Sequence, residues 1–297
     1  MNASKTVLVS GATGFIGRAL CAELRARDHS VRTLSRSHGD VLWDVDQGTI
    51  DPDTLDGVDT VVHLAGEPVV QRWTRAAKQR ILQSRVSSTE LLVGAILEQS
   101  TRPDFICSSG INYYGYNCGS PVDEASASGE GFLAQVCRAW EGAAQPLADS
   151  GVRTVFVRTG LALSAEGGAL AKMLPVFKWG LGGRIGSGAQ YMSWIALSDL
   201  VAIYCRMIED QSINGPINAV APVPVVNAAF TKALGKVLGR PTLCTLPMPV
   251  AKALLGKMGE ETVLADVGVL PSRLLATGFQ WEMPELEAAL RQILNRV

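Results

Sequence analysis

A glycine-spaced turn near the start of the chain constrains the fold more than any other stretch. The apolar run Val7-Leu8-Val9 is followed by glycines at intervals of three residues, Gly11, Gly14 and Gly17, and by an apolar-periodic segment. This pattern predicts a strand, a tight turn and a helix. Gly11 permits the turn, Gly14 lets the backbone approach a ligand, and Gly17 lets the helix pack against the strand. The free N–H groups and positive dipole end of such a helix favour a phosphate, so we predict a nucleotide-binding turn.

The end of the second expected strand, 31–35, indicates which nucleotide binds. In dinucleotide-binding folds, an acidic residue at this place holds the ribose 2′-hydroxyl, whereas an arginine accommodates a 2′-phosphate. Here Ser35 stands in the place of the acid and Arg36 follows it. A hydroxyl and a guanidinium together bind a phosphate that a carboxylate would repel. We therefore expect NADP(H) rather than NAD, the alternative being that Arg36 is an exposed loop residue.

Strands and helices alternate along the first half of the chain. Further strands are expected at 58–66, 104–110, 152–158 and 215–219, and helices at 15–27, 73–99 (one or two), 131–149 and 198–209. The Asp-rich stretch 40–59 contains little to pack and is expected to run along the surface. The alternation predicts an α/β fold, a Rossmann-type doubly wound parallel sheet with a smaller C-terminal substrate domain. We assign 1–160 to the NADP-binding domain, with 191–220 returning to it, and 161–190 and 221–297 to the smaller domain.

Composition narrows the class of partner. The 28 acidic and 27 basic residues nearly cancel, so no basic field argues for nucleic acid or a membrane surface. No apolar run reaches the ~18 residues of a spanning helix, and no signal-peptide pattern opens the chain. The six cysteines are scattered without a Cys-x-x-Cys pair, which favours reduced thiols. We predict a cytoplasmic protein with a small-molecule substrate and no nucleic-acid, membrane or metal partner, and leave the oligomeric state open.

The end of the 58–66 strand is the second candidate site. Its last residues are small, and this leaves room for a cofactor to cross the sheet edge. Glu67 follows at once, and His63 lies within the strand, where we expect a core histidine bonded to backbone rather than a catalytic one. The arginines of the 73–99 helix most simply form a solvated face, from which one could turn toward the cofactor or substrate.

Together, these motifs resemble a known superfamily. Thr13-Gly14-Phe15-Ile16-Gly17, His63-Leu64-Ala65-Gly66, Ser108-Ser109 and Tyr114-Gly115 resemble the extended short-chain dehydrogenase/reductases. His63–Pro68, Trp140-Glu141, Arg158-Thr159-Gly160 and Met192-Ser193-Trp194-Ile195 are similar to its atypical "epimerase family" branch, described as sugar-nucleotide-epimerase-like or cell-division-inhibitor-like. The resemblance covers the whole chain and implies a Rossmann domain that binds NADP(H). It implies cofactor contacts from Gly11, Thr13, Gly14, Phe15, Ile16, Gly17, Ser35, Arg36, Leu64, Ala65, Gly66, Glu67 and Ser108.

The chain departs from that superfamily at the residues that carry its chemistry. Active members use Tyr-x-x-x-Lys, and Val136 and Trp140 stand in the two places here. None of the five tyrosines has a lysine four residues later. A tyrosine, with a reference pKa near ~10, is a poor base without that cation. The usual catalytic serine or threonine corresponds to Gly110, and Ser109 lies one residue away.

Four residues remain as candidates for proton transfer: Glu67, Ser109, Tyr113 and Tyr114. For each of them, a packing or ribose-binding role stays open as well. The sequence is compatible with an NADP-dependent oxidoreductase or sugar-nucleotide-epimerase-like enzyme, acting on a nucleotide-sugar or a carbonyl compound with a non-standard acid/base group. The alternative is a non-catalytic NADP(H) sensor or interaction protein, and fold alone does not choose between the two.

Overall fold

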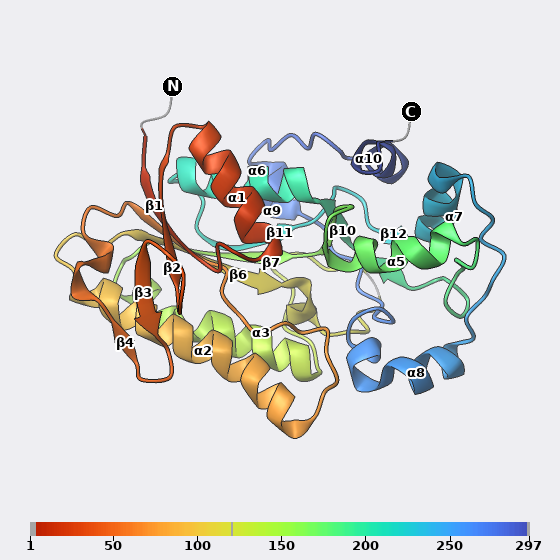
Figure 1. Ribbon diagram of the computed structural model, residues 1–297, viewed down its shortest axis with the longest axis horizontal. Coiled ribbons are helices and arrows are strands. Elements are labelled where there is room, and N and C mark those ends of the chain that lie inside the picture. Colours follow the sequence, from red (N-terminus) through yellow and green to blue (C-terminus); the bar gives the residue numbers. More distant parts are fainter. Residues whose placement is uncertain (1–3, 120, 296–297) are drawn as a thin grey trace. The chain divides into compact units, whose positions relative to one another are not determined.

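The computed structural model describes residues 4–119 and 121–295 (Figure 1). The chain divides into two compact units. The first comprises Met1–Ser109, Val136–Val157 and Val201–Pro216, and the second comprises Gly110–Gln135, Arg158–Leu200 and Ile217–Val297. Residues 110–135 thus belong to the second unit, and the domain limits given above stay a prediction.

An eight-stranded sheet organises the first unit, in the order β11-β7-β6-β5-β1-β2-β3-β4. Its strands are β1 (Thr6–Ser10), β2 (Ser30–Ser35), β3 (Val41–Asp44), β4 (Thr49–Ile50), β5 (Thr60–His63), β6 (Asp104–Gly110), β7 (Thr154–Thr159) and β11 (Gly215–Ala219). β1 pairs in parallel with both β2 and β5, and the strand order reverses at this point. Among the pairings described within this sheet, only that of β3 with β4 is antiparallel. The predicted Rossmann-type, mostly parallel sheet is confirmed.

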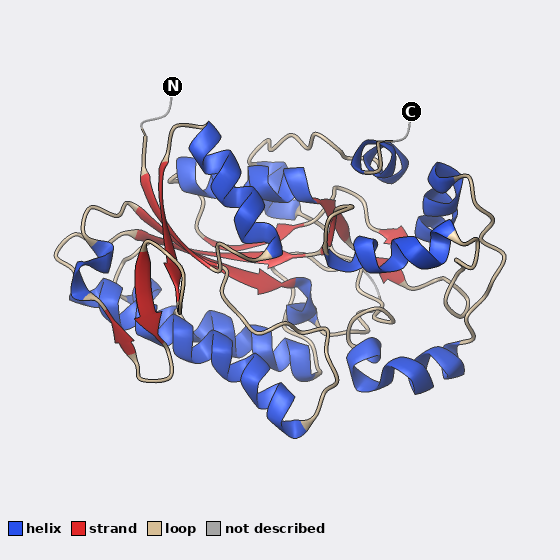
Figure 2. Ribbon diagram, viewed as in Figure 1, coloured by secondary structure: helices blue, strands red, loops and turns tan. Residues whose placement is uncertain are grey.

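Helices cover both faces of this sheet. α1 (Phe15–Ala26) and α6 (Leu197–Glu209) lie on one face, and α2 (Arg75–Glu98) and α3 (Phe132–Ala143) on the other (Figures 1 and 2). The stretch 73–99 forms one long helix. The helix expected at 131–149 is interrupted, and α4 (Gln145–Asp149) follows α3, with Pro146 in its first turn. Proline has no N–H with which to continue a helix, and this accounts for the break.

The expectation for residues 40–59 was wrong. This stretch forms β3, β4 and a short 3₁₀ helix, Pro52–Leu55, and it supplies Trp43, Leu55 and Val58 to the core of the first unit. The ring of Trp43 packs edge-on against the ring of His63, with centroids 6.0 Å apart. Its polar composition concealed a strand pattern in which a buried residue alternates with exposed ones.

The second unit carries two small two-stranded sheets and five helices among the residues described. β8 (Leu161–Leu163) pairs in parallel with β10 (Trp194–Ala196), and β9 (Tyr191–Met192) pairs antiparallel with β12 (Val225–Val226). The helices are α5 (Gly168–Lys178), α7 (Asn227–Leu238), α8 (Met248–Glu260), α9 (Ser272–Ala276) and α10 (Leu286–Ile293). Trp194, Phe230 and Leu290 lie at the centre of its core. Pro247 and Pro271 stand immediately before α8 and α9, where the missing N–H of proline interrupts no helical hydrogen bond.

Replacing the buried tryptophan of β3 tests whether this edge of the sheet contributes to stability. Trp43→Ala is expected to lower the free energy of unfolding by about 3–5 kcal/mol, because it removes a large side chain from the core. Leu42→Ala is the matched control. Leu42 is the next residue in the same strand but is 53% exposed, so its loss should change stability by less than about 0.5 kcal/mol. Urea unfolding of both variants makes the comparison, and equal effects would contradict it.

Candidate functional site

The turn between β1 and α1 leaves the start of the helix open. Gly14 precedes the first turn of α1, and no side chain caps the helix there. Gly11 has a φ of +71°, and a Cβ at this position would lie 2.8 Å from the backbone nitrogen of Ala65. A Cβ at Gly17 would overlap the carbonyl oxygen of Gly11. A Cβ at Gly14 would meet only that same oxygen, at 3.1 Å, so the space before the helix N-terminus is accessible to a phosphate.

A cavity of about 750 Å³ extends over this turn and the ends of β1, β2 and β5. It is built entirely from residues of the first unit. Nine of the expected cofactor contacts line it: Gly11, Thr13, Gly14, Ser35, Arg36, Leu64, Ala65, Gly66 and Glu67. Phe15, Ile16, Gly17 and Ser108 do not line it. The structure therefore brings the glycine turn, the end of β2 and the end of β5 together around one space.

Two arginines that sequence reasoning missed, Arg18 and Arg25, line the cavity together with Arg36. They are seven residues apart on α1, so they lie on the same side of the helix, and this spacing was the signal available in the sequence. The Ser35 hydroxyl lies within 3.4 Å of the backbone nitrogens of Ser37 and His38, from which it accepts hydrogen bonds. Three guanidinium groups in one cavity favour an anion with more than one charge.

His63 connects elements that border the cavity. Its Nδ1 lies 2.6 Å from the Ser10 hydroxyl and its Nε2 lies 3.0 Å from the Ser88 hydroxyl. Because Ser88 donates to the carbonyl of Ser84 and Ser10 accepts from the backbone nitrogens of Leu64 and Ala65, the proton belongs on Nε2. Complete burial lowers the pKa of His63 to about 3. His63 is thus a neutral core histidine, as expected, but it bonds to hydroxyls rather than to backbone.

Glu67 lines the cavity and lies in a loop that is hydrogen-bonded to α2. Its backbone nitrogen donates to the Ser84 hydroxyl at 3.0 Å, and its carbonyl accepts from Arg85 at 3.0 Å. Its carboxylate accepts from Gln71 at 3.2 Å and lies 3.6 Å from Nε of Arg80. The main chain of this loop is therefore anchored to α2, whereas the carboxylate already interacts with two polar side chains.

Ser109 forms a pair with a carboxylate that sequence reasoning did not select. Its buried hydroxyl donates to Oε1 of Glu141, on α3, at 2.7 Å. β6 pairs with β5 so that Cys107 is opposite His63. Ser109 follows Cys107 by two residues, as Ala65 of the cavity wall follows His63, so Ser109 lies on the strand next to that wall, although neither Ser109 nor Glu141 lines the cavity itself. A serine whose proton points at a carboxylate is arranged for proton transfer.

Val136 and Trp140, which stand in the places of the missing tyrosine and lysine, belong to the buried side of α3. Both side chains are buried, with exposed fractions of 2% and 6%. The Trp140 ring packs edge-on against His63, with centroids 6.2 Å apart, and the guanidinium carbon of Arg85 lies 4.9 Å from its centroid. Neither residue exchanges a proton in this environment.

The two candidate tyrosines lie in the second unit. The Tyr114 hydroxyl donates to Asn218 at 2.8 Å and accepts from Arg158 at 3.0 Å. Burial raises the pKa of Tyr114 to about 12. The guanidinium carbon of Arg158 lies 3.4 Å from the centroid of the Tyr113 ring, which is partly exposed. With its raised pKa and both hydrogen bonds of its hydroxyl filled, Tyr114 stays protonated near neutral pH and is not available as a base there.

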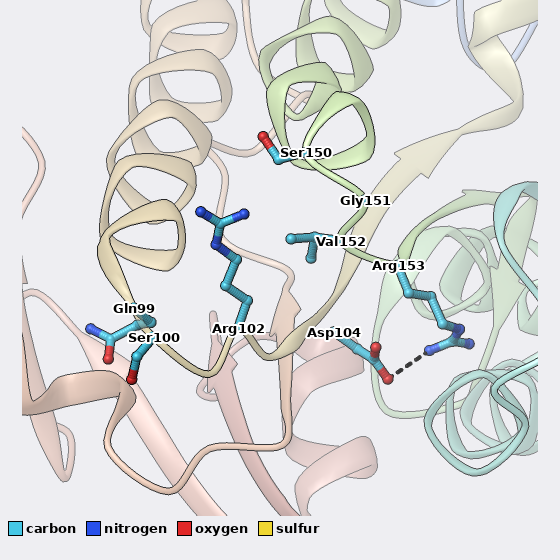
Figure 3. A pocket seen from close by; sticks show the side chains of 8 residues that line it. All are labelled: Gln99, Ser100, Arg102, Asp104, Ser150, Gly151, Val152 and Arg153. Carbon is cyan, nitrogen blue, oxygen red and sulfur yellow. Dashed lines mark hydrogen bonds and ion pairs between the residues drawn. The ribbon is translucent and has the colours of Figure 1, made fainter.

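A second cavity, of about 590 Å³, is lined by residues at the start of β6 and by the loop that precedes β7 (Figure 3). Its most buried charges, Asp104 and Arg153, form an ion pair of 3.1 Å. Arg153 also donates to the carbonyls of Met207, Asp210 and Ile213, and Arg102 donates to the carbonyl of Leu97. These groups already have protein partners, and the cavity lies at the amino ends of the strands, away from the glycine turn. We therefore assign it no ligand.

Residues 4–119 and 121–295 contain neither a candidate metal site nor a helix suited to span a membrane. No group of three or more histidine, cysteine, aspartate or glutamate side chains is arranged there to hold a metal ion. In the same part of the chain, no helix has the length and apolar character needed to cross a membrane.

The fold and the cavity define the class of protein, a Rossmann-type dinucleotide-binding protein. Comparison with known sequences then shows the family. Residues 7–219 match the NAD dependent epimerase/dehydratase family, and residues 246–293 match a domain of unknown function, DUF1731. The chain belongs to this epimerase family, so the resemblance stated above is confirmed.

Relatives extend over the whole chain. An epimerase family protein of Mycobacterium tuberculosis is 41% identical over 299 residues, covering 99% of each chain. The human epimerase family protein SDR39U1 is 38% identical over 295 residues, covering 97% of this chain and 99% of that one. Its crystal structure with NADPH has a TM-score of 0.89, with 98% of this chain and 100% of that one covered. A nucleoside-diphosphate sugar epimerase from Corynebacterium glutamicum is 36% identical, with a TM-score of 0.83 over 98% of this chain and 58% of that one.

The buried histidine predicts a pH-dependent stability. The pKa of His63 is about 3 in the folded chain and about 6.5 when unfolded. Below pH 6.5 the unfolded chain therefore binds a proton that the folded chain does not. This group is expected to remove about 2 kcal/mol of stability between pH 7 and pH 5.

Denaturant unfolding at several pH values measures this effect, and His63→Gln should remove that part of the pH dependence. His38→Gln, at an exposed position, is the control and should leave the pH dependence unchanged. Identical pH profiles for wild type and His63→Gln would contradict the assignment.

Proposed function

We propose that this chain is an NADP(H)-dependent oxidoreductase or sugar-nucleotide-epimerase-like enzyme that acts on a small molecule. The observation that carries the proposal is the single cavity that joins an uncapped helix N-terminus to three arginines. The relatives support it, since the human protein was crystallised with NADPH and the Corynebacterium protein is named as a nucleoside-diphosphate sugar epimerase. A nucleotide-sugar or another carbonyl compound is the proposed substrate class.

The residues of the cavity fit NADP(H). The start of α1, with Gly11 and Gly14, would hold the pyrophosphate. Ser35 and Arg36 would hold the 2′-phosphate of the adenosine, and Arg18 and Arg25 would add positive charge to the same cavity. The end of β5, from Leu64 to Glu67, would then contact the nicotinamide half. When bound, this cofactor supplies or accepts the hydride.

Ser109 and Glu141 are the proposed route for the proton. In the oxidising direction, the Ser109 hydroxyl accepts the proton of the substrate hydroxyl while its own proton passes to the Glu141 carboxylate. In the reducing direction the two transfers reverse, so that the substrate oxygen gains a proton as the carbonyl carbon gains the hydride. Glu67 stays a second candidate at the cavity rim, and Tyr113 a third.

The alternative function is a non-catalytic NADP(H) sensor. The burial of Val136 and Trp140 in the places of the missing pair favours it, because those positions supply no titratable group. Tight NADPH binding without turnover of any carbonyl or nucleotide-sugar substrate would support the sensor over the enzyme.

Arg36 provides the test of cofactor choice. Arg36→Ala is expected to weaken NADPH binding by about 1.5–3 kcal/mol, because it removes a charge-assisted hydrogen bond to the 2′-phosphate. NADH binding should change little. Fluorescence titrations with both cofactors measure this, and Arg72→Ala, an exposed arginine outside the cavity, is the control. Equal losses for NADPH and NADH would show that Arg36 does not read the 2′-phosphate.

Glu141→Gln tests the proton route. Glutamine can still accept the hydrogen bond from Ser109 but cannot take its proton, so turnover should fall by roughly 10²–10⁴-fold while NADPH affinity is retained. Ser109→Ala should have a comparable effect, and the double variant should be little worse than either single one. Turnover by both variants at the wild-type rate would place the acid/base group elsewhere.

A further inference from the structure

Arg85 differs from the other arginines of α2. Arg75 and Arg80 are exposed, whereas Arg85 is largely buried. Its guanidinium carbon lies 4.9 Å from the Trp140 ring centroid. One nitrogen, Nη1, donates to the carbonyls of Glu67 at 3.0 Å and Ile81 at 2.9 Å. The sequence allowed one arginine of the 73–99 helix to turn toward the cofactor or substrate, and Arg85 is the one that faces inward.

The charge of Arg85 is not neutralised by an ion pair. No carboxylate among residues 4–119 and 121–295 forms one with it, and its only side-chain hydrogen bonds there go to two backbone carbonyls. The Glu67 carboxylate attracts it but is shared with Gln71 and Arg80. Burial raises the pKa of the nearby Cys107 well above its ordinary value, so this thiol is neutral. The guanidinium itself stays protonated at any ordinary pH.

Gly66 brings this charge to the wall of the cavity. A Cβ at Gly66 would lie 3.0 Å from Cζ of Arg85 and 3.1 Å from its Nη2, so only glycine lets the guanidinium approach this closely. Gly66 itself lines the cavity. The strand order β5-β1-β2 places it on the opposite side of the glycine turn from Arg36. A dinucleotide with its 2′-phosphate at Arg36 would therefore extend its nicotinamide half toward Gly66.

We infer that Arg85 makes the cofactor site prefer the reduced cofactor, by holding a positive charge beside the nicotinamide half. The inference rests on the proposed function, and it adds the direction of the reaction. The oxidised nicotinamide ring carries a positive charge and the dihydronicotinamide ring carries none. A fixed cation beside the ring repels the first and leaves the second unaffected. The site would therefore retain NADPH and release NADP⁺, as a reductase requires.

The test is a set of binding titrations on the full chain with NADPH, NADP⁺ and 2′,5′-ADP, which has the phosphorylated adenosine but no nicotinamide. Wild type should bind NADPH on the order of tenfold more tightly than NADP⁺. Arg85→Met, which keeps the length of the side chain without its charge, should bring the two affinities close together. Arg85→Lys should restore most of the preference, and Arg75→Met, the same change at an exposed position of the same helix, should leave it intact. The affinity for 2′,5′-ADP should be the same in all four proteins.

The outcomes separate this inference from the proposed function. If wild type binds NADPH and NADP⁺ equally while binding 2′,5′-ADP, the role of Arg85 is overturned and the NADP(H) site stands. If Arg85→Met weakens both cofactors by the same factor, Arg85 only anchors the Glu67 loop and the inference is again overturned. If wild type binds none of the three ligands, both proposals fall. The wild-type ratio decides the question even if Arg85→Met does not fold.

Discussion

The close approach of the glycine turn to the end of β5 is the contact on which the candidate site depends. The backbone of Gly11 comes so near to Leu64 and Ala65 that a single added carbon would not fit. The Ser10 hydroxyl fixes the same approach by accepting hydrogen bonds from the nitrogens of Leu64 and Ala65. His63 and Ser88 extend that network to α2. The cavity therefore lies between strands whose ends are held by buried hydrogen bonds rather than by flexible loops, and its shape is defined before a ligand binds.

Local patterns in the sequence were sufficient to predict the parts of the fold that follow from them. The strand, glycine turn and first helix are specified by residues close together in the chain, and so is the place of Arg36 at the end of β2. The strands β3 and β4 were not predicted, because a short edge strand buries only one of its faces and its exposed positions were polar. Trp43 was the one residue there whose size demanded burial.

Contacts between side chains of different helices and strands could not be predicted from the sequence. The hydrogen bond between Ser109 and Glu141 depends on how α3 is rotated against β6, and no spacing within either element specifies that rotation. The same holds for Arg85, since its close approach to the cavity wall depends on the absence of a side chain at Gly66, 19 residues earlier in the chain. Glu141 and Arg85 are both charged residues on helices, and for such residues the ordinary expectation is a solvent-exposed helix face.

The positions of these groups suggest how the site can function without a tyrosine–lysine pair. In that pair the lysine carries a positive charge that also lowers the pKa of the tyrosine. The positive charge and the proton transfer are therefore located together. Here Trp140 occupies the lysine position and stacks with Arg85, a cation that comes from another helix and cannot release a proton. In the proposed proton route, Ser109 and Glu141 lie on β6 and α3, and their hydrogen bond does not involve that cation. Because charge and proton transfer belong to separate elements, a substitution at one can leave the other intact, which a shared lysine would not allow.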